Sequence, residues 1–240
     1  MAELNLELVK ALADDMYEKW YKKFVEKEQE RNETEGHLFN VFALWNRLSG
    51  IGETLHSRLL HFLLSDDPMH GQKDKFLMKF LEMAGIEDPQ EGAWYATAET
   101  GRVDVMLKRT NPHSVIIVEN KSNWAGDQSN QLYRYWYENM YAQERKTYDD
   151  SRYKIIYLSP GADKKFDGQS CCKPLKKWFV QRGKQCDYDK LPCKIPLEPV
   201  VWHFHDHIQK WLEQCIDALP ETNQPLRNYL NQYKEYCKRL

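Results

Sequence analysis

The chain has 240 residues, of which 42% are hydrophobic, and this length supports one sizeable core while excluding two large domains. Its formal net charge of −2 at pH 7 excludes a polycation that binds phosphate backbones over its whole surface, so any nucleic-acid contact must be local. Apolar runs are short and the N-terminus is charged, which argues against a membrane span or signal peptide. Because the six cysteines lack a CxxC pair, we expect a cytoplasmic protein with reduced thiols.

The N-terminal part of the chain is predicted to be helical. Within residues 1–35, apolar residues recur at every fourth position among charged ones, which is typical of a supporting amphipathic helix. These apolar positions are Leu8, Leu12, Met16, Trp20 and Phe24. Further helices are expected at 38–48, 53–66 and 73–84, because Gly50, Pro68 and Gly85 follow them as breakers. Glu53 is therefore predicted to lie in a first helical turn.

The middle of the chain changes to short runs of strand-forming residues. Strands are expected at 94–99, 102–108 and 115–119, joined by tight turns into an antiparallel meander. The remaining expected elements are a helix from an Asp127 cap to about Gln143, strands at 153–159 and 199–204, and helices within 206–240. The chain is thus predicted to form a single α/β domain, 1–240, with helical additions at both ends.

Residues 161–195 form a basic, cysteine-containing insertion. They contain nine Lys or Arg against four Asp, a local balance of +5. Two interpretations remain open, a solvated loop and a lobe that faces a substrate or partner.

The most informative stretch places Asp104 fifteen residues before Glu119-Asn120-Lys121. Alternate residues of a strand point the same way, so Glu119 and Lys121 share a face with Val115 and Ile117. If the hairpin turns symmetrically between residues 111 and 112, residues whose numbers sum to 223 are opposed, and Asp104 faces Glu119. Two carboxylates about 5 Å apart repel each other unless a cation neutralises them.

These groups suit phosphodiester hydrolysis. Carboxylate oxygens are the ligands that Mg²⁺ or Mn²⁺ prefers, and such an ion keeps several waters while bridging to a phosphate. A bound metal lowers the pKa of its water and neutralises charge that grows at phosphorus. Lys121, two residues from Glu119, could orient or help deprotonate the attacking water and stabilise the transition state. The sequence therefore predicts a metal site with Asp104, Glu119 and Lys121 as catalytic residues.

The G-R-V-D run at 101–104 and the E-x-K run at 119–121 resemble the PD-(D/E)XK nuclease superfamily. The resemblance implies an α/β restriction-endonuclease-like three-layer core, with a mixed central sheet flanked by helices. It also implies Glu53, Asp104 and Glu119 as metal ligands. Val103 stands where the motif has proline, which removes no ligand.

Two further motifs are similar to a bacterial branch of that superfamily. Residues 53–57 carry its E-x-x-H-S opening, and residues 127–132 carry D-Q-x-x-Q-L. Gln131 and Tyr135 fit a Q-x-x-x-Y feature of the superfamily. Gln128 and Gln131, three apart on an expected helical face, are predicted to hold a water or phosphate beside the metal or to cap the helix.

Several patterns carry a weaker or different implication. His203, His205 and His207 sit where a strand gives way to a helix, so a shared zinc ion is not expected. Cys171, Cys172, Cys186 and Cys193 lack a recognised zinc spacing. His56 is expected to join its helix to the sheet by a hydrogen bond rather than act as a base. The aromatic residues of the helix near 132–141 are mostly assigned to the core.

The resemblance implies a metal-dependent nuclease that cuts DNA, in restriction, repair or phage defence. RNA is not excluded as a substrate, because a metal and phosphate site does not distinguish sugars. The alternative is an inactive nucleic-acid- or protein-binding module on the same fold. A homodimer is one possible assembly.

Overall fold

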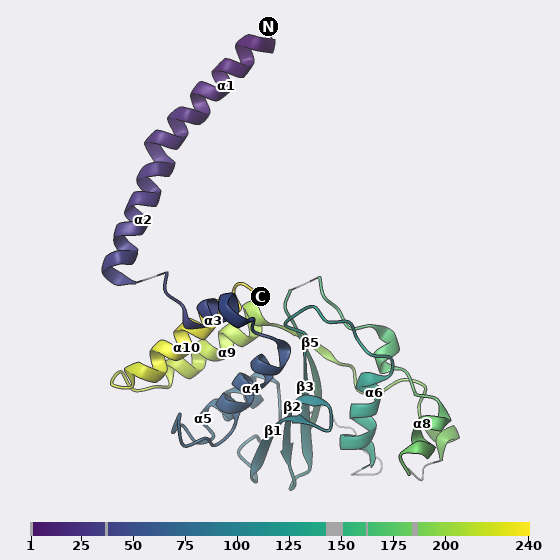
Figure 1. Cartoon of the computed structure of the whole chain (residues 1–240). Helices are drawn as coiled ribbons and strands as arrows, with labels where there is room; N and C mark the ends of the chain where they lie inside the picture. The colour runs from purple at the N-terminus through teal and green to yellow at the C-terminus, as the bar shows by residue number, and fades with distance from the viewer. Residues whose placement is uncertain (1, 37, 143–150, 162, 184–186) are drawn as a thin grey trace. The chain divides into compact units, whose positions relative to one another are not determined.

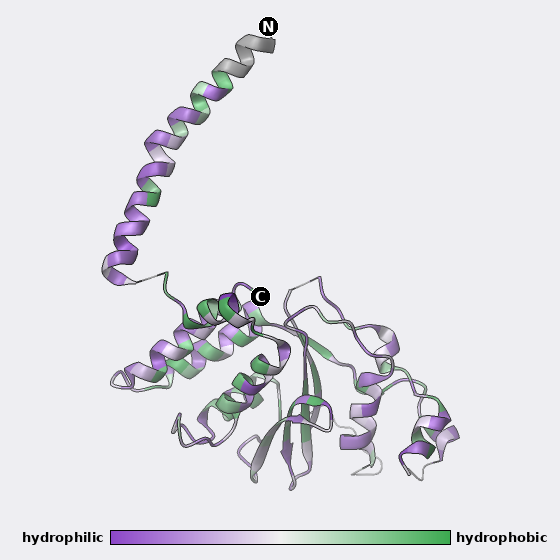
Figure 2. Cartoon of the chain, in the orientation of Figure 1, coloured by the Kyte–Doolittle hydropathy of each residue, from purple (hydrophilic) through white to green (hydrophobic). Residues whose placement is uncertain are grey.

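The computed structural model describes residues 2–36, 38–142, 151–161, 163–183 and 187–240, and the chain divides into two compact units, residues 1–48 and 49–240 (Figure 1). The first unit is helical, with α1 (Ala2–Met16), the π-helical turn η1 (Tyr17–Tyr21), α2 (Lys22–Glu35) and most of α3 (Val41–Ser49). α2 ends because Gly36 adopts a left-handed conformation, with φ of 62°. The predicted apolar positions from Leu8 to Phe24 are exposed, and Figure 2 shows hydrophobic and hydrophilic residues mixed along the helices of this unit.

The second unit contains a five-stranded sheet in the order β1-β2-β3-β4-β5. Its strands are β1 (Trp94–Thr100), β2 (Val103–Arg109), β3 (Ser114–Asn120), β4 (Tyr153–Ser159) and β5 (Val200–His203). β1, β2 and β3 form the predicted antiparallel meander, while β4 and β5 add in parallel. The predicted mixed sheet is confirmed.

Helices cover both faces of this sheet, which gives the predicted three layers (Figure 1). One side carries α4 (Glu53–Leu64), α5 (Lys75–Met83), α9 (Gln209–Asp217) and α10 (Gln224–Cys237). The other side carries α6 (Gln131–Trp136) and its π-helical continuation η2 (Tyr137–Tyr141). The predicted α/β restriction-endonuclease-like fold is therefore confirmed. No helix in the described part of the chain has the length and apolar character needed to cross a membrane.

β3 is the central strand, and every one of its residues is buried. Its odd-numbered residues Val115 and Ile117 pack in a core cluster with Tyr133 and Trp136 of α6. On the opposite face, the Asn120 side chain donates to the Glu53 backbone oxygen of α4. Neighbouring residues at the end of β3 therefore point to different layers, as strand geometry requires.

The helix after β3 begins later than predicted. α6 starts at Gln131, and Asn130 precedes it in a left-handed conformation with φ of 62°. A left-handed residue cannot continue a helix, so Asp127 is not its cap. The predicted end near Gln143 lies outside the described residues.

The basic insertion is partly folded into the core, so a purely solvated loop is wrong. It contains η3 (Gly168–Cys171), α8 (Lys176–Gln181) and η4 (Tyr188–Lys190). Phe179 and Leu191 are buried in the cluster that also holds α6, which fixes the insertion beside that helix.

Candidate active site

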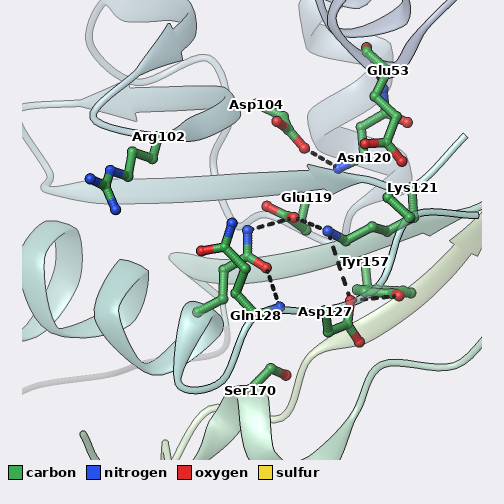
Figure 3. A network of polar contacts seen from close by, with 12 residues as sticks. Glu53, Arg102, Asp104, Glu119, Asn120, Lys121, Asp127, Gln128, Tyr157 and Ser170 are labelled. Atoms are coloured by element: carbon green, nitrogen blue, oxygen red, sulfur yellow. Dashed lines mark hydrogen bonds and ion pairs between the residues drawn. The ribbon is translucent and has the colours of Figure 1, made fainter. Parts of the chain in front are cut away.

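The β2–β3 hairpin has the predicted register. The observed pairs run from Val105 with Val118 to Arg109 with Ser114, so opposed residue numbers sum to 223 as predicted. Asp104 lies one step before the first of these pairs. Its Oδ2 accepts a hydrogen bond of 2.6 Å from the Asn120 backbone N–H, which fixes its carboxylate beside the end of β3 (Figure 3).

Glu119 occupies the centre of the polar network. Its side chain is 2% exposed, and Oε1 lies 2.7 Å from the Lys121 Nζ. The same oxygen accepts a hydrogen bond of 2.8 Å from the Gln131 Nε2. Oε2 is buried and has no hydrogen-bond partner among the described residues, so this carboxylate retains one oxygen that could bind a cation.

Lys121 follows β3 directly, and its backbone N–H donates to the Leu158 oxygen at 2.9 Å. Its ammonium lies 3.8 Å from the Asp127 Oδ1, in addition to its contact with Glu119. Burial lowers the pKa of Lys121, but the negative charges of Glu119, Asp127 and Glu53 outweigh this and raise it. The side chain therefore stays charged at neutral pH.

Asp127 was predicted only as a helix cap, but it belongs to the site. Its Oδ1 accepts from the Tyr157 hydroxyl at 3.0 Å, and its Oδ2 accepts from the Asp167 backbone N–H at 2.6 Å. These contacts hold the carboxylate near Lys121. The D-Q-x-x-Q-L motif contained the signal, but a local helix cap was the wrong interpretation of its first residue.

Glu53 lies in the first turn of α4, as predicted. Its Oε1 is buried, and no group in the described part of the chain forms a hydrogen bond with it. Its backbone oxygen and the Ser57 hydroxyl accept from the Asn120 side chain, at 2.8 and 3.1 Å. Asn120 of β3 thus ties α4 to the sheet through Glu53 and Ser57.

His56 does not make the helix-to-sheet bond that was predicted for it. Its Nδ1 lies 3.0 Å from the hydroxyl of Tyr233 in α10, and burial lowers its pKa to about 4. It joins two helices, whereas Ser57 makes the contact to the strand.

The residues of the glutamine motif divide into two groups. Gln131 donates from Nε2 to Glu119 and to the Tyr135 hydroxyl, which itself donates to the Arg102 oxygen. Gln128 instead precedes the helix, so the predicted common helical face is wrong. Its Oε1 accepts from Arg134 at 3.2 Å.

We expect Gln131→Ala to lower the turnover of a metal-dependent cleavage reaction about tenfold, because Glu119 loses the donor that orients it. The measurement is steady-state cleavage of an oligonucleotide, with the exposed Gln90→Ala as the matched control. An unchanged kcat in Gln131→Ala would contradict the positioning role.

The carboxylates are electrostatically unsatisfied. Burial, followed by the charge of Glu119, raises the pKa of Asp104 to about 8. Burial also raises the pKa of Glu119, although Lys121 opposes this. Buried carboxylates of this kind must take up a proton or receive a cation.

The donor set fits a hard divalent cation. Asp104 and Glu119 supply oxygen ligands, and the unpartnered oxygens of Glu53 and Glu119 remain available. No three His, Cys, Asp or Glu side chains converge on one point within the described residues. Because Mg²⁺ is commonly held by one or two carboxylates and several waters, two direct ligands suffice.

The other candidate metal patterns gain no support. His203 and His205 stack with ring centroids 5.4 Å apart, while the Nδ1 of His207 accepts from the His203 backbone N–H. Cys171 is buried and Cys193 exposed, both as free thiols, whereas Cys186 lies outside the described residues.

Comparison with known proteins identifies the family. The sequence matches the family model of the PD-(D/E)XK nuclease superfamily over residues 39–238. Searches of curated proteins and of solved structures gave no significant match. The match spans the sheet, its flanking helices and the Asp104, Glu119 and Lys121 cluster, and the chain belongs to the PD-(D/E)XK nuclease superfamily.

Proposed function

We propose that this protein is a nuclease that hydrolyses phosphodiester bonds of DNA with Mg²⁺ or Mn²⁺. The observation that carries the proposal is the buried Glu119 carboxylate, bonded to the Lys121 ammonium at 2.7 Å and adjacent to Asp104. Buried charged groups add little to the stability of a fold, whereas preorganised charges stabilise the negative charge that develops on a phosphate during cleavage.

Asp104 and Glu119 would hold the metal directly. Glu53, which does not converge with them in the described residues, is proposed as a third acidic ligand. When bound, the metal supplies an activated water and neutralises charge on the phosphate. The unpartnered buried oxygens of Glu53 and Glu119 support this assignment. Their desolvation is costly, and a divalent cation removes the cost.

The chain's own residues would position the reactants. Lys121 remains protonated beside Glu119, so its ammonium would orient the attacking water and stabilise the negative charge of the transition state. Asp127 would keep the ammonium in place. Gln131 and Tyr135 would fix the rotamer of Glu119 through the bonds described above.

DNA is the proposed substrate, and a role in restriction, repair or phage defence in the cytoplasm is the proposed setting. Comparison of DNA and RNA oligonucleotides of one sequence, single-stranded and duplex, with Mg²⁺, Mn²⁺ or EDTA tests the substrate. We expect cleavage of DNA that requires metal. Faster cleavage of RNA would overturn the sugar assignment, and binding without cleavage would favour the inactive binding module.

A further inference from the structure

A small cavity of about 50 Å³ lies beside the Gln131 side of the site. Its lining includes three arginines, Arg102, Arg134 and Arg182, together with one acid, Glu138. We refer to these three arginines and their cavity as the arginine pocket. Gln131 lines the cavity and also bonds Glu119 at 2.8 Å, so the pocket shares a wall with the proposed catalytic site.

The three arginines come from distant parts of the sequence. Arg102 belongs to the turn before β2, Arg134 to α6, and Arg182 caps the C-terminus of α8. Arg102 is part of the G-R-V-D motif, but the catalytic assignment gives its side chain no role. Figure 3 shows it on the opposite side of Glu119 from Lys121 in that view.

Only part of the positive charge is neutralised by the lining residues. Arg182 pairs with Glu138 at 2.9 Å, whereas Arg134 donates to the neutral amide of Gln128. Burial lowers the pKa of Arg134, and the charges of Arg102 and Arg182 lower it further. Like charges that converge in this way repel one another, and an anion in the cavity would relieve the repulsion.

We propose that the arginine pocket binds one phosphate group of the nucleic-acid strand, next to the bond that the catalytic site cleaves. The location of that bond rests on the proposed function. Guanidinium groups suit phosphate because their planar N–H donors match its oxygens, and the cavity's small volume suits a single anionic group rather than a base. The phosphate is either an internal phosphodiester or a terminal phosphomonoester.

The test is binding in EDTA, measured by fluorescence anisotropy of an internally labelled single-stranded oligonucleotide. Arg102→Gln, Arg182→Gln and the double variant are compared with the wild type. Arg102 and Arg182 are exposed, so these variants should fold normally. Lys176→Gln, an exposed change on α8 that removes the same charge as each single arginine variant, is the matched control for the single variants.

We expect the double variant to raise Kd about tenfold or more. Its dependence of log K on log salt should become shallower by roughly 0.7, the contribution of one phosphate on a single strand. Lys176→Gln should remain near wild type. Equal behaviour of the double variant and Lys176→Gln would overturn the pocket.

Oligonucleotides with a 5′-phosphate, a 3′-phosphate or hydroxyl ends separate the two sources. An equal loss for all of them assigns an internal phosphodiester, and a loss confined to one phosphorylated end assigns a terminal phosphomonoester. Weakened binding by a protein that cleaves nothing with metal would sink the nuclease proposal and keep the pocket. Metal-dependent cleavage together with binding, both unchanged in the arginine variants, would overturn the arginine pocket and support the nuclease proposal.

Discussion

Lys121→Met and Glu119→Gln should each lower kcat for metal-dependent cleavage by about a hundredfold to a thousandfold. Lys121 would lose the charge that stabilises the transition state, and such preorganised groups are worth that much in other active sites. Glu119→Gln keeps the side-chain size but removes the anionic ligand. Rates measured under single-turnover conditions separate this loss from weaker substrate binding.

Lys108→Met is the matched control for the lysine change. Lys108 lies on β2 opposite Val115, at the other end of the same hairpin. Its substitution should therefore leave kcat unchanged. Thermal melts check folding, because Lys121→Met leaves the 2% exposed Glu119 without its cationic partner. Full activity in a folded Lys121→Met protein would remove Lys121 from the mechanism.

Asp104→Asn should stabilise the metal-free protein, and the gain should grow as pH rises. The pKa of Asp104 is raised to about 8 in the folded state, against about 3.9 in an unfolded chain. Between these values the folded state holds the proton more tightly, so the wild type loses stability as pH increases. Above pH 8 the difference should level off at a few kcal/mol, since each pKa unit corresponds to about 1.4 kcal/mol.

Urea unfolding in EDTA at several pH values between about 4 and 9 measures this difference. Adding Mg²⁺ should raise the wild-type free energy of unfolding more than that of Asp104→Asn, because only the wild type has an ionisable ligand at position 104. If the free energy of unfolding depended on pH in the same way for both proteins, the raised pKa of the Asp104 carboxyl would be contradicted.

The sequence predicted the part of the site that depends on local geometry. Strand alternation and a symmetric hairpin correctly gave the register that brings Asp104 to the end of β3 beside Glu119. The E-x-K spacing likewise predicted that Glu119 and Lys121 share a face, and the structure brings their side chains to 2.7 Å. These features follow from residues close together in one hairpin.

Features that depend on distant segments were not predictable in the same way. Asp127 is held by Tyr157 and the Asp167 backbone. These partners are distant in sequence, so the local pattern of residues does not predict either contact. Because Asn130 is left-handed, α6 begins only at Gln131, and Gln128 lies outside the helix. Tertiary contacts overrode the local capping signal in both cases.

The single-domain organisation remains a prediction. Residues 1–48 form their own compact unit, and the family match begins at residue 39.

The arginine pocket could not be predicted from the sequence. Arg102 and Arg182 line one cavity only because the 161–195 insertion folds onto α6.

Nicking of supercoiled plasmid by the purified protein tests the central claim most directly. The wild type is compared in Mg²⁺ and in EDTA with Asp104→Ala purified in the same way, which controls for a contaminating nuclease. Nicking or linearisation only by the wild type in Mg²⁺ is the predicted result. Equal cleavage by Asp104→Ala, or cleavage that persists in EDTA, would contradict a metal-dependent site at Asp104 and Glu119.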